Sequence, residues 1–284
     1  MDAKYLSAQS LSYGQQQGEL EVLLTGGILE IPLGFQPLGI SSRPADSSTD
    51  MIAIAAYFEP AVCLARVQTK GDTLTLSFKV SWIRAVRNGC EDVRMFPRIL
   101  EPAGANRAET VNFAADGSLW VSRNGERVFF VMEPPKERGG LWNLVEKISL
   151  PENGVMSMVH SALLVPDTLH TIESNAALDQ WKMFQYSLDG RKVLEPKLVA
   201  GLPPWTYGIA FKGKREGTYA VTDFRSERPH GVYRGGYIAV PGVAGNGICF
   251  LSDGSALVTR YCQGHPGCFN GVPGALLYVP ASLF

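Results

Sequence analysis

The sequence predicts an all-β chain folded as a β-propeller, and three observations carry this prediction. Short apolar runs alternate with turn residues, among them 30 glycines and 18 prolines, as expected for many short strands. A segment of strand–turn–strand character recurs roughly every 40–50 residues, which is the period of a propeller blade. No long segment has the apolar period of a helix. A β-sandwich, or a pair of small β domains, is the competing interpretation.

The repeat is clearest in four segments, each of which reads as a polar residue, a small residue, an apolar run, a turn and a second apolar run. They begin at Ala108, Val159, Thr206 and Gly245, and a weaker fifth copy begins at Leu38. We expect each copy to form the first two strands of a blade. The outer strands follow, for example in "KMFQYSLDGRKVLEPKLV" after the second copy and "GGYIAVP" after the third.

The two ends of the chain predict how the ring closes. The last segment, "GALLYVPASLF", looks like the third strand of a blade that lacks its fourth. We expect residues 20–27, "LEVLLTGG", to supply that strand, with residues 1–19 as an N-terminal extension of a single domain that spans residues 1–284. The interval from Ser42 to Phe113 is long for one repeat, so we expect a degenerate blade between about Lys79 and Asn106. The prediction is therefore six blades, with five as the alternative.

Composition limits the classes of partner. The formal net charge is −1, from 26 basic and 27 acidic residues, so we expect neither a nucleic-acid partner nor a membrane-surface partner. No apolar stretch is long enough for a membrane span, and the N-terminus lacks the apolar region of a secretory signal. The 5 cysteines are odd in number and scattered, which suits a reducing compartment. We expect a cytoplasmic protein.

Propeller geometry predicts a site without reference to any family. The start of the first strand and the end of the second strand of every blade lie on one face, around the channel mouth, where binding groups usually gather. The blade starts are Glu109, His160, Tyr207 and Asn246. The ends of the second strands are Tyr57, Glu59, Arg123, Glu173, Asp223, Arg225, Arg260 and Tyr261. Polar residues at such positions also serve as structural hydrogen-bonding groups between blades, so the hypothesis concerns the set.

Within this set the residue types indicate different roles. An imidazole titrates near neutral pH, so His160 is the candidate general acid or base. Arg260 is placed to polarise a carbonyl or to stabilise an oxyanion, and Glu109 and Asp223 complete the candidate catalytic residues. Trp205 and Tyr207 are expected to form an aromatic wall for an apolar substrate. The remaining candidate substrate-binding residues are Asn246, Tyr261, Arg123, Glu173 and Tyr57.

Three segments, "VNFAADGSLWVS", "YGIAF…GTYAVTD" and above all "GNGICFLSDGSALVT", resemble the blade starts of the six-bladed regucalcin/gluconolactonase and strictosidine-synthase-like superfamily. The resemblance covers roughly Ala108 to the C-terminus. In the lactonase branch it implies a divalent metal, Ca²⁺ or Zn²⁺, and Glu109, Asn246 and Asp223 would be its ligands. The early Glu-Gly-Pro signature of that branch is absent here, so the resemblance favours the metal-free branch, which uses the same pocket for ring-forming chemistry.

Three functions follow from these observations. The first is an enzyme of specialised, natural-product metabolism that binds a small apolar molecule in the channel and promotes cofactor-free cyclisation, cycloaddition or isomerisation, which gain much from orientation. The second is a metal-dependent lactonase of the gluconolactonase type. The third is a non-catalytic lectin or interaction propeller. The four blade starts all differ, which favours one asymmetric pocket over the repeated sites of a lectin. The substrate and the oligomeric state are left open.

Overall fold

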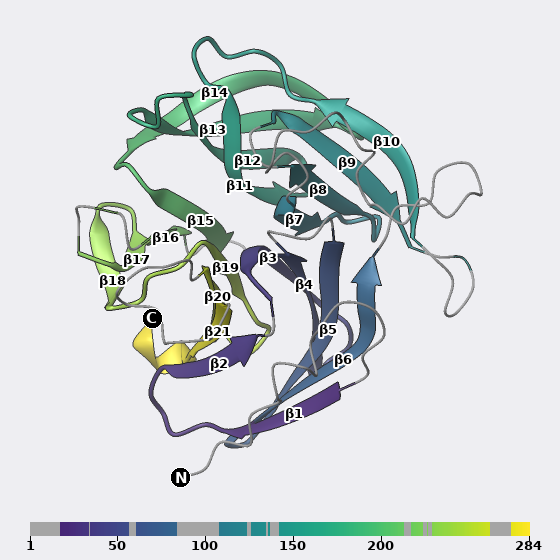
Figure 1. The fold of residues 1–284 in the computed structure, drawn as a ribbon, viewed down its shortest axis with the longest axis vertical. Coiled ribbons are helices and arrows are strands. Elements are labelled where there is room, and N and C mark those ends of the chain that lie inside the picture. Colours follow the sequence, from purple (N-terminus) through teal and green to yellow (C-terminus); the bar gives the residue numbers. More distant parts are fainter. Residues whose placement is uncertain are drawn as a thin grey trace.

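The computed structural model describes residues 18–33, 35–56, 61–83, 108–123, 126–134, 136, 142–212, 217–223, 226, 229–261 and 274–284. Within these residues the chain forms five antiparallel sheets and no α-helix, apart from a 3₁₀ turn, η2, at Ala281–Leu283. The sheets are arranged around a ring (Figure 1). The prediction of an all-β propeller is confirmed.

Each sheet is one blade, and its strands follow the chain from the channel outward. Blade 1 contains β3 (Pro37–Pro44), β4 (Thr49–Ala56), β5 (Ala61–Lys70) and β6 (Thr73–Ile83), with β1 (Gly18–Leu23) as a fifth strand. Blade 2 contains β7 (Ala108–Phe113), β8 (Leu119–Arg123), β9 (Val128–Glu133) and β10 (Asn143–Ser149). Blade 3 contains β11 (Met158–Val165), β12 (Thr168–Ser174), β13 (Trp181–Asp189) and β14 (Lys192–Leu202).

The last two blades complete the ring. Blade 4 contains β15 (Thr206–Phe211), β16 (Thr218–Thr222), β17 (Gly231–Arg234) and β18 (Tyr237–Pro241). Blade 5 contains β19 (Gly247–Phe250), β20 (Ala256–Tyr261), β21 (Gly274–Val279) and β2 (Leu29–Leu33). All five sequence repeats therefore form the inner hairpin of a blade, as predicted.

The Asp-Gly-Ser motif forms the turn of two inner hairpins. In blade 5 the amide of Ser255 donates to Oδ1 of Asp253 at 2.9 Å, and Gly254 has a φ of +84°. In blade 2, Ser118 bonds Asp116 in the same way at 2.9 Å. An aspartate that accepts a bond from the amide two residues on, followed by a glycine in the left-handed region, fixes a tight turn. The repeated motif is thus a repeated turn.

The prediction of six blades is wrong for the described structure, because blades 1 and 2 touch directly. The innermost strands contact one another in the closed order β3, β7, β11, β15, β19 and back to β3. At the boundary between β3 and β7 the amide of Phe113 donates to Oγ of Ser41 at 3.2 Å. A Cβ at Gly39 would lie 2.6 Å from the carbonyl oxygen of Glu109. This contact leaves no space for a sixth blade, although residues 84–107 themselves lie outside the described residues.

The strand that closes the ring also differs from the prediction. Residues 29–33, which form β2, pair with β21 from Leu29 opposite Tyr278 to Leu33 opposite Gly274. Of the segment expected to close the ring, residues 20–27, the first half (residues 20–23) instead lies in β1, which pairs with β6 at the edge of blade 1 (Figure 1). Both segments begin with leucine, glutamate and a β-branched apolar residue, so the pattern alone could not separate them. A strand from the N-terminal part of the chain therefore closes the ring, as predicted, but it is β2 and not the segment at residues 20–27.

The core is divided among the boundaries between blades. Five clusters of buried apolar residues each combine side chains from two successive blades, including the boundary between blades 5 and 1. For example, Ile54 of blade 1 packs in one cluster with Leu276 of blade 5. Because the apolar surface of each sheet is buried against its neighbours, the ring is stabilised by blade-to-blade packing.

No helix among the described residues is long and apolar enough to cross a membrane. The cytoplasmic location stays a prediction.

Candidate active site

The predicted site residues lie at one end of the sheets, as the strand pairings show. Each inner strand begins opposite the end of its neighbour: Ala108 lies opposite Arg123 in blade 2, and Val159 lies opposite Glu173 in blade 3. In blade 5, Gly247 lies opposite Thr259. The structure therefore brings the blade starts and the second-strand ends to the same face. Tyr57, Glu59 and Arg225 lie outside the described residues.

The most organised group on this face is the His160 centre, which we define as Glu109, His160 and Ser174. Nδ1 of His160 lies 3.0 Å from Oε1 of Glu109, and Nε2 lies 2.6 Å from Oγ of Ser174. All three side chains are buried, with His160 5% exposed and Ser174 0% exposed. The centre joins blade 2, which supplies Glu109, to blade 3, which supplies the other two residues.

Ser174 was not among the predicted site residues, although the repeat ends on it. The prediction selected its neighbour Glu173. Successive side chains of a strand point to opposite faces of the sheet, so only one of the two could meet His160. The register of β12 determines which of Glu173 and Ser174 faces His160, and the sequence alone does not give that register.

Aromatic rings surround the imidazole. His160 stacks on Trp181 with ring centroids 4.4 Å apart, and Tyr207 meets its edge at 5.0 Å. Trp205 stacks on Tyr207 at 6.5 Å and is partly exposed. Trp205 has a φ of 62°, in the left-handed region where a bulky side chain is rare. Trp205, Tyr207 and Trp181 thus form an aromatic cluster around His160, and the predicted wall for an apolar substrate stays a prediction.

Glu173, which is 0% exposed, is the centre of a separate group that we call the Glu173 brace: Arg127, Asn153, Thr171, Glu173 and Tyr186. The carboxylate accepts from Thr171 Oγ1 at 2.6 Å, Tyr186 OH at 2.6 Å and Asn153 Nδ2 at 2.7 Å. It also forms an ion pair with Arg127 of blade 2. Both carboxylate oxygens are therefore occupied by protein groups, and the geometry gives Glu173 a structural position between blades.

Within the Glu173 brace, the charged side chains of Arg127 and Glu173 stabilise each other. Burial on its own lowers the pKa of Arg127, but the adjacent carboxylate of Glu173 outweighs burial and raises it. Burial, followed by the same carboxylate, raises the pKa of Tyr186 well above its usual range. Arg127 therefore stays charged and Tyr186 stays a neutral donor, as a stable buried network requires.

The other predicted residues form local pairs. Nδ2 of Asn246 donates to Oδ2 of Asp223 at 2.7 Å, which links blades 4 and 5, and the amide of Tyr261 donates to Oδ1 of Asn246 at 3.0 Å. Arg123 forms an ion pair with Glu126, and Arg260 forms one with Glu30 of β2. These contacts place both arginines beside acidic partners on the rim.

The three alternative metal ligands form two separate hydrogen-bonded pairs. Glu109 bonds His160, whereas Asp223 and Asn246 bond each other on blades 4 and 5. In the part of the chain that the structure describes, no group of three or more His, Cys, Asp or Glu side chains is arranged to hold a metal ion.

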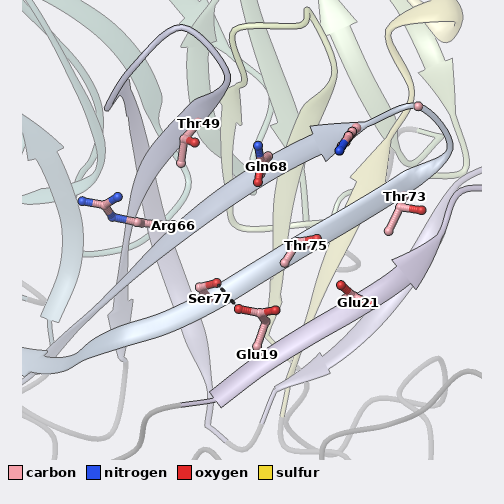
Figure 2. A pocket seen from close by; sticks show the side chains of 10 residues that line it. Glu19, Glu21, Thr49, Arg66, Gln68, Thr73, Thr75 and Ser77 are labelled. Atoms are coloured by element: carbon pink, nitrogen blue, oxygen red, sulfur yellow. Dashed lines mark hydrogen bonds between the residues drawn. The ribbon is translucent and has the colours of Figure 1, made fainter.

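A broad polar depression of about 950 Å³ lies away from the channel, on blade 1. Figure 2 shows its lining, which includes Glu19 of β1, Ser77 of β6 and Arg66 and Gln68 of β5. Ser77 Oγ donates to Oε2 of Glu19 at 3.1 Å. Polar side chains alternating along these strands are what a solvated sheet face requires, so the depression is no candidate site.

No known protein family and no curated protein matches the chain. Similar solved structures include a gluconolactonase from Xanthomonas campestris, with 12% identity and a TM-score of 0.46 over 96% of this chain and 93% of that one. A virginiamycin B lyase from Staphylococcus aureus has 11% identity and a TM-score of 0.38 over 86% of this chain and 67% of that one. A streptogramin B lyase has 10% identity and a TM-score of 0.38 over 89% and 97%. Similarity at this level carries no argument about activity, so the function must be argued from the chain's own residues.

Proposed function

We propose that the chain is an enzyme that acts on a small apolar organic molecule and that its His160 centre moves a proton. The observation that carries the proposal is the position of His160 between a carboxylate and a hydroxyl. In acid–base and nucleophilic sites, a histidine base is often hydrogen-bonded on one side to the group whose proton it takes. On its other side it is hydrogen-bonded to a group that orients the imidazole ring.

The hydrogen bonds assign a role to each residue. A carboxylate at Nδ1 favours the tautomer with its proton on Nδ1, which leaves Nε2 as an acceptor for the Ser174 hydroxyl. Because both ring nitrogens are engaged, His160 acts through Ser174: Oγ takes a proton from the substrate while its own proton passes to Nε2. Glu109 holds the imidazole in place and stabilises the imidazolium that forms.

The surrounding rings favour an apolar substrate. Trp205, which is partly exposed and stacks on the buried Tyr207, offers flat apolar surface next to the centre, and such rings contribute much contact area for bound aromatic or alicyclic groups. We therefore propose cofactor-free cyclisation, cycloaddition or isomerisation in natural-product metabolism as the reaction class. When they take place within one molecule and release no leaving group, all these reactions conserve the mass of the substrate.

A second candidate function is hydrolysis of a lactone, and the distance of 2.6 Å between Ser174 Oγ and His160 Nε2 favours it. In that case Oγ attacks the carbonyl carbon while His160 takes the hydroxyl proton. The ring C–O bond then breaks, and His160 returns this proton to the leaving alkoxide, which stays attached through the acyl chain. Water, deprotonated by His160, next attacks the acyl-enzyme, and Ser174 regains its proton as the hydroxy acid leaves. A hydrolysed lactone gains the mass of one water, which separates this candidate from the first.

The burial of the centre also gives it a structural role between blades 2 and 3, so a test must separate catalysis from stability. We would incubate the protein with apolar polyketide-like and terpenoid-like compounds and with lactones, and follow each compound by mass spectrometry. The variant is Ser174→Ala, and the control is Tyr186→Phe, which removes one hydroxyl from the Glu173 brace.

The proposal predicts that the wild type and Tyr186→Phe convert the same compound and that Ser174→Ala, while folded, does not. A product of unchanged mass supports the first candidate, and a product heavier by one water supports the second. Conversion by Ser174→Ala at the wild-type rate, or no conversion of any compound by the wild type, would overturn the proposal.

A further inference from the structure

A second cavity, of about 570 Å³, lies at the opposite end of the channel from the His160 centre. It is formed where the innermost strands β3, β11, β15 and β19 approach their turns, and none of its residues was among the predicted site residues. The cavity is large enough for a small organic ligand.

One part of the lining is apolar and comes from three blades. Leu163 of blade 3, Ala210 and Phe211 of blade 4, and Ile248 and Phe250 of blade 5 contribute to it. Phe250 also packs edge-on against Phe284 near the C-terminus, with ring centroids 5.0 Å apart. This part offers a preformed surface for a hydrocarbon body.

The other part of the lining carries an excess of positive charge. Arg43 and Lys212 line the cavity, and neither forms an ion pair with a carboxylate among the described residues. The guanidinium of Arg43 lies 4.7 Å above the ring of Phe113, and Nζ of Lys212 lies 5.3 Å from the ring of Phe284. The aromatic faces hold these cations in position but leave their donors available.

The acid in the lining, Asp50, is already engaged by another residue. Its Oδ2 accepts from the amide of Ser252 at 2.9 Å, and its Oδ1 accepts from Ser252 Oγ at 2.6 Å. It is buried, with 7% of its surface exposed. Asp50 therefore fixes the turn of blade 5, and the two cations are left to face the cavity.

A hydroxyl adds a neutral donor to the same region. Oγ of Ser41 accepts a hydrogen bond from the amide of Phe113 at 3.2 Å. Its own hydrogen has no acceptor among the described residues, so it is available to a ligand. Arg43, two residues further along β3, supplies charge at the same strand end.

From these contacts we propose that the cavity binds a small amphipathic carboxylate, with its hydrocarbon body against the apolar lining and its anionic group facing Arg43 and Lys212. Two cations against a single carboxylate, beside apolar surface, favour a ligand that carries both features, since each feature alone leaves half of the lining unmatched. This site is independent of the proposed reaction at the His160 centre.

Isothermal titration calorimetry with decanoate tests the proposal. The matched ligands are decanol, which keeps the hydrocarbon and lacks the charge, and inorganic phosphate, which carries charge and lacks the hydrocarbon. The variants are Arg43→Gln and Lys212→Gln, and Lys197→Gln on the exposed face of β14 is the control. Lys212→Gln keeps the test valid if Arg43→Gln fails to fold.

We expect decanoate to bind at least about tenfold more tightly than decanol or phosphate, and each cavity variant to weaken decanoate by about tenfold or more. Lys197→Gln should bind like the wild type. Equal binding of decanoate and decanol, tighter binding of phosphate, or unchanged affinity in both cavity variants would overturn the proposal.

Discussion

Oε1 of Glu109 lies 3.0 Å from Nδ1 of His160, although the two residues stand 51 positions apart in the chain. The contact follows from the repeat, because both residues begin the innermost strand of their blade and the two blades are neighbours. The separation is thus one blade, and the pair joins a carboxylate to an imidazole across a blade boundary.

The role of Glu109 predicts the effect of Glu109→Gln. A glutamine can donate from its amide nitrogen to Nδ1 of His160, which moves the imidazole proton to Nε2 and removes the acceptor for Ser174. We expect turnover to fall by about 100-fold or more while the melting temperature changes little. Rates and melting curves of the same preparation check this, and equal rates for variant and wild type would contradict it.

The Glu173 brace predicts a large loss of stability in Arg127→Met. The substitution leaves the carboxylate of Glu173, 0% exposed, without its cation. Breaking a buried ion pair in this way costs about 3–5 kcal/mol. Urea unfolding measures the change. The control is Arg191→Met, since Arg191 lies in a solvent-exposed ion-pair network where the loss should stay below about 1 kcal/mol.

Direct contact between blades 1 and 2 predicts that Gly39→Ala is destabilising. The new Cβ would lie 2.6 Å from the carbonyl oxygen of Glu109 and 2.7 Å from Cα of Thr110, both backbone atoms of β7. Overpacking of this kind costs about 1–3 kcal/mol. At Gly27 an added Cβ meets nothing within 4 Å, so Gly27→Ala is the matched control. Equal stability of the two variants would argue against the five-bladed ring.

His170 predicts how stability depends on pH. Its ring meets Phe211 edge-on at 5.2 Å, and burial lowers its pKa from the usual 6.5. The unfolded chain therefore binds this proton at a higher pH than the folded chain does, so stability falls as the pH drops below about 6.5. Urea unfolding from neutral to mildly acidic pH should show a smaller decline in His170→Gln than in the wild type. Identical declines would contradict the assignment.

Two buried cysteines predict that thiol reactivity differs between the native and the unfolded protein. Burial raises the pKa of Cys63 and of Cys249 to about 12, and the reactive form of cysteine is the thiolate. At mildly alkaline pH iodoacetamide should modify neither residue in the native protein and both after unfolding in urea. Peptide mapping by mass spectrometry distinguishes the two cysteines, and rapid native labelling of either would refute this description of the core.

Much of the fold was predictable because its signals are local. The Asp-Gly-Ser turns and the apolar alternation on either side located the inner hairpins of the blades. Blade number and ring closure were not predictable, since they depend on which strand edges meet. The segments at residues 20–27 and 29–33 carry similar patterns, and only the pairing of Leu29 with Tyr278 decides between them.

The candidate site was predicted less completely. The prediction that His160 and Glu109 share one face came from strand order, and the structure shows them in contact. The prediction chose Glu173 and missed Ser174, because successive side chains of a strand point to opposite faces of the sheet. The cavity beside Arg43 was missed because its residues come from four blades and form no sequence motif.

The central claim is that His160 transfers a proton during turnover, and a direct comparison of wild type and His160→Gln tests it. The measurement is the initial rate on a converted compound, at a temperature where circular dichroism shows both proteins folded. The account predicts a rate at least about 100-fold lower for His160→Gln. A folded variant that retains the wild-type rate would show that His160 serves only to join blades 2 and 3.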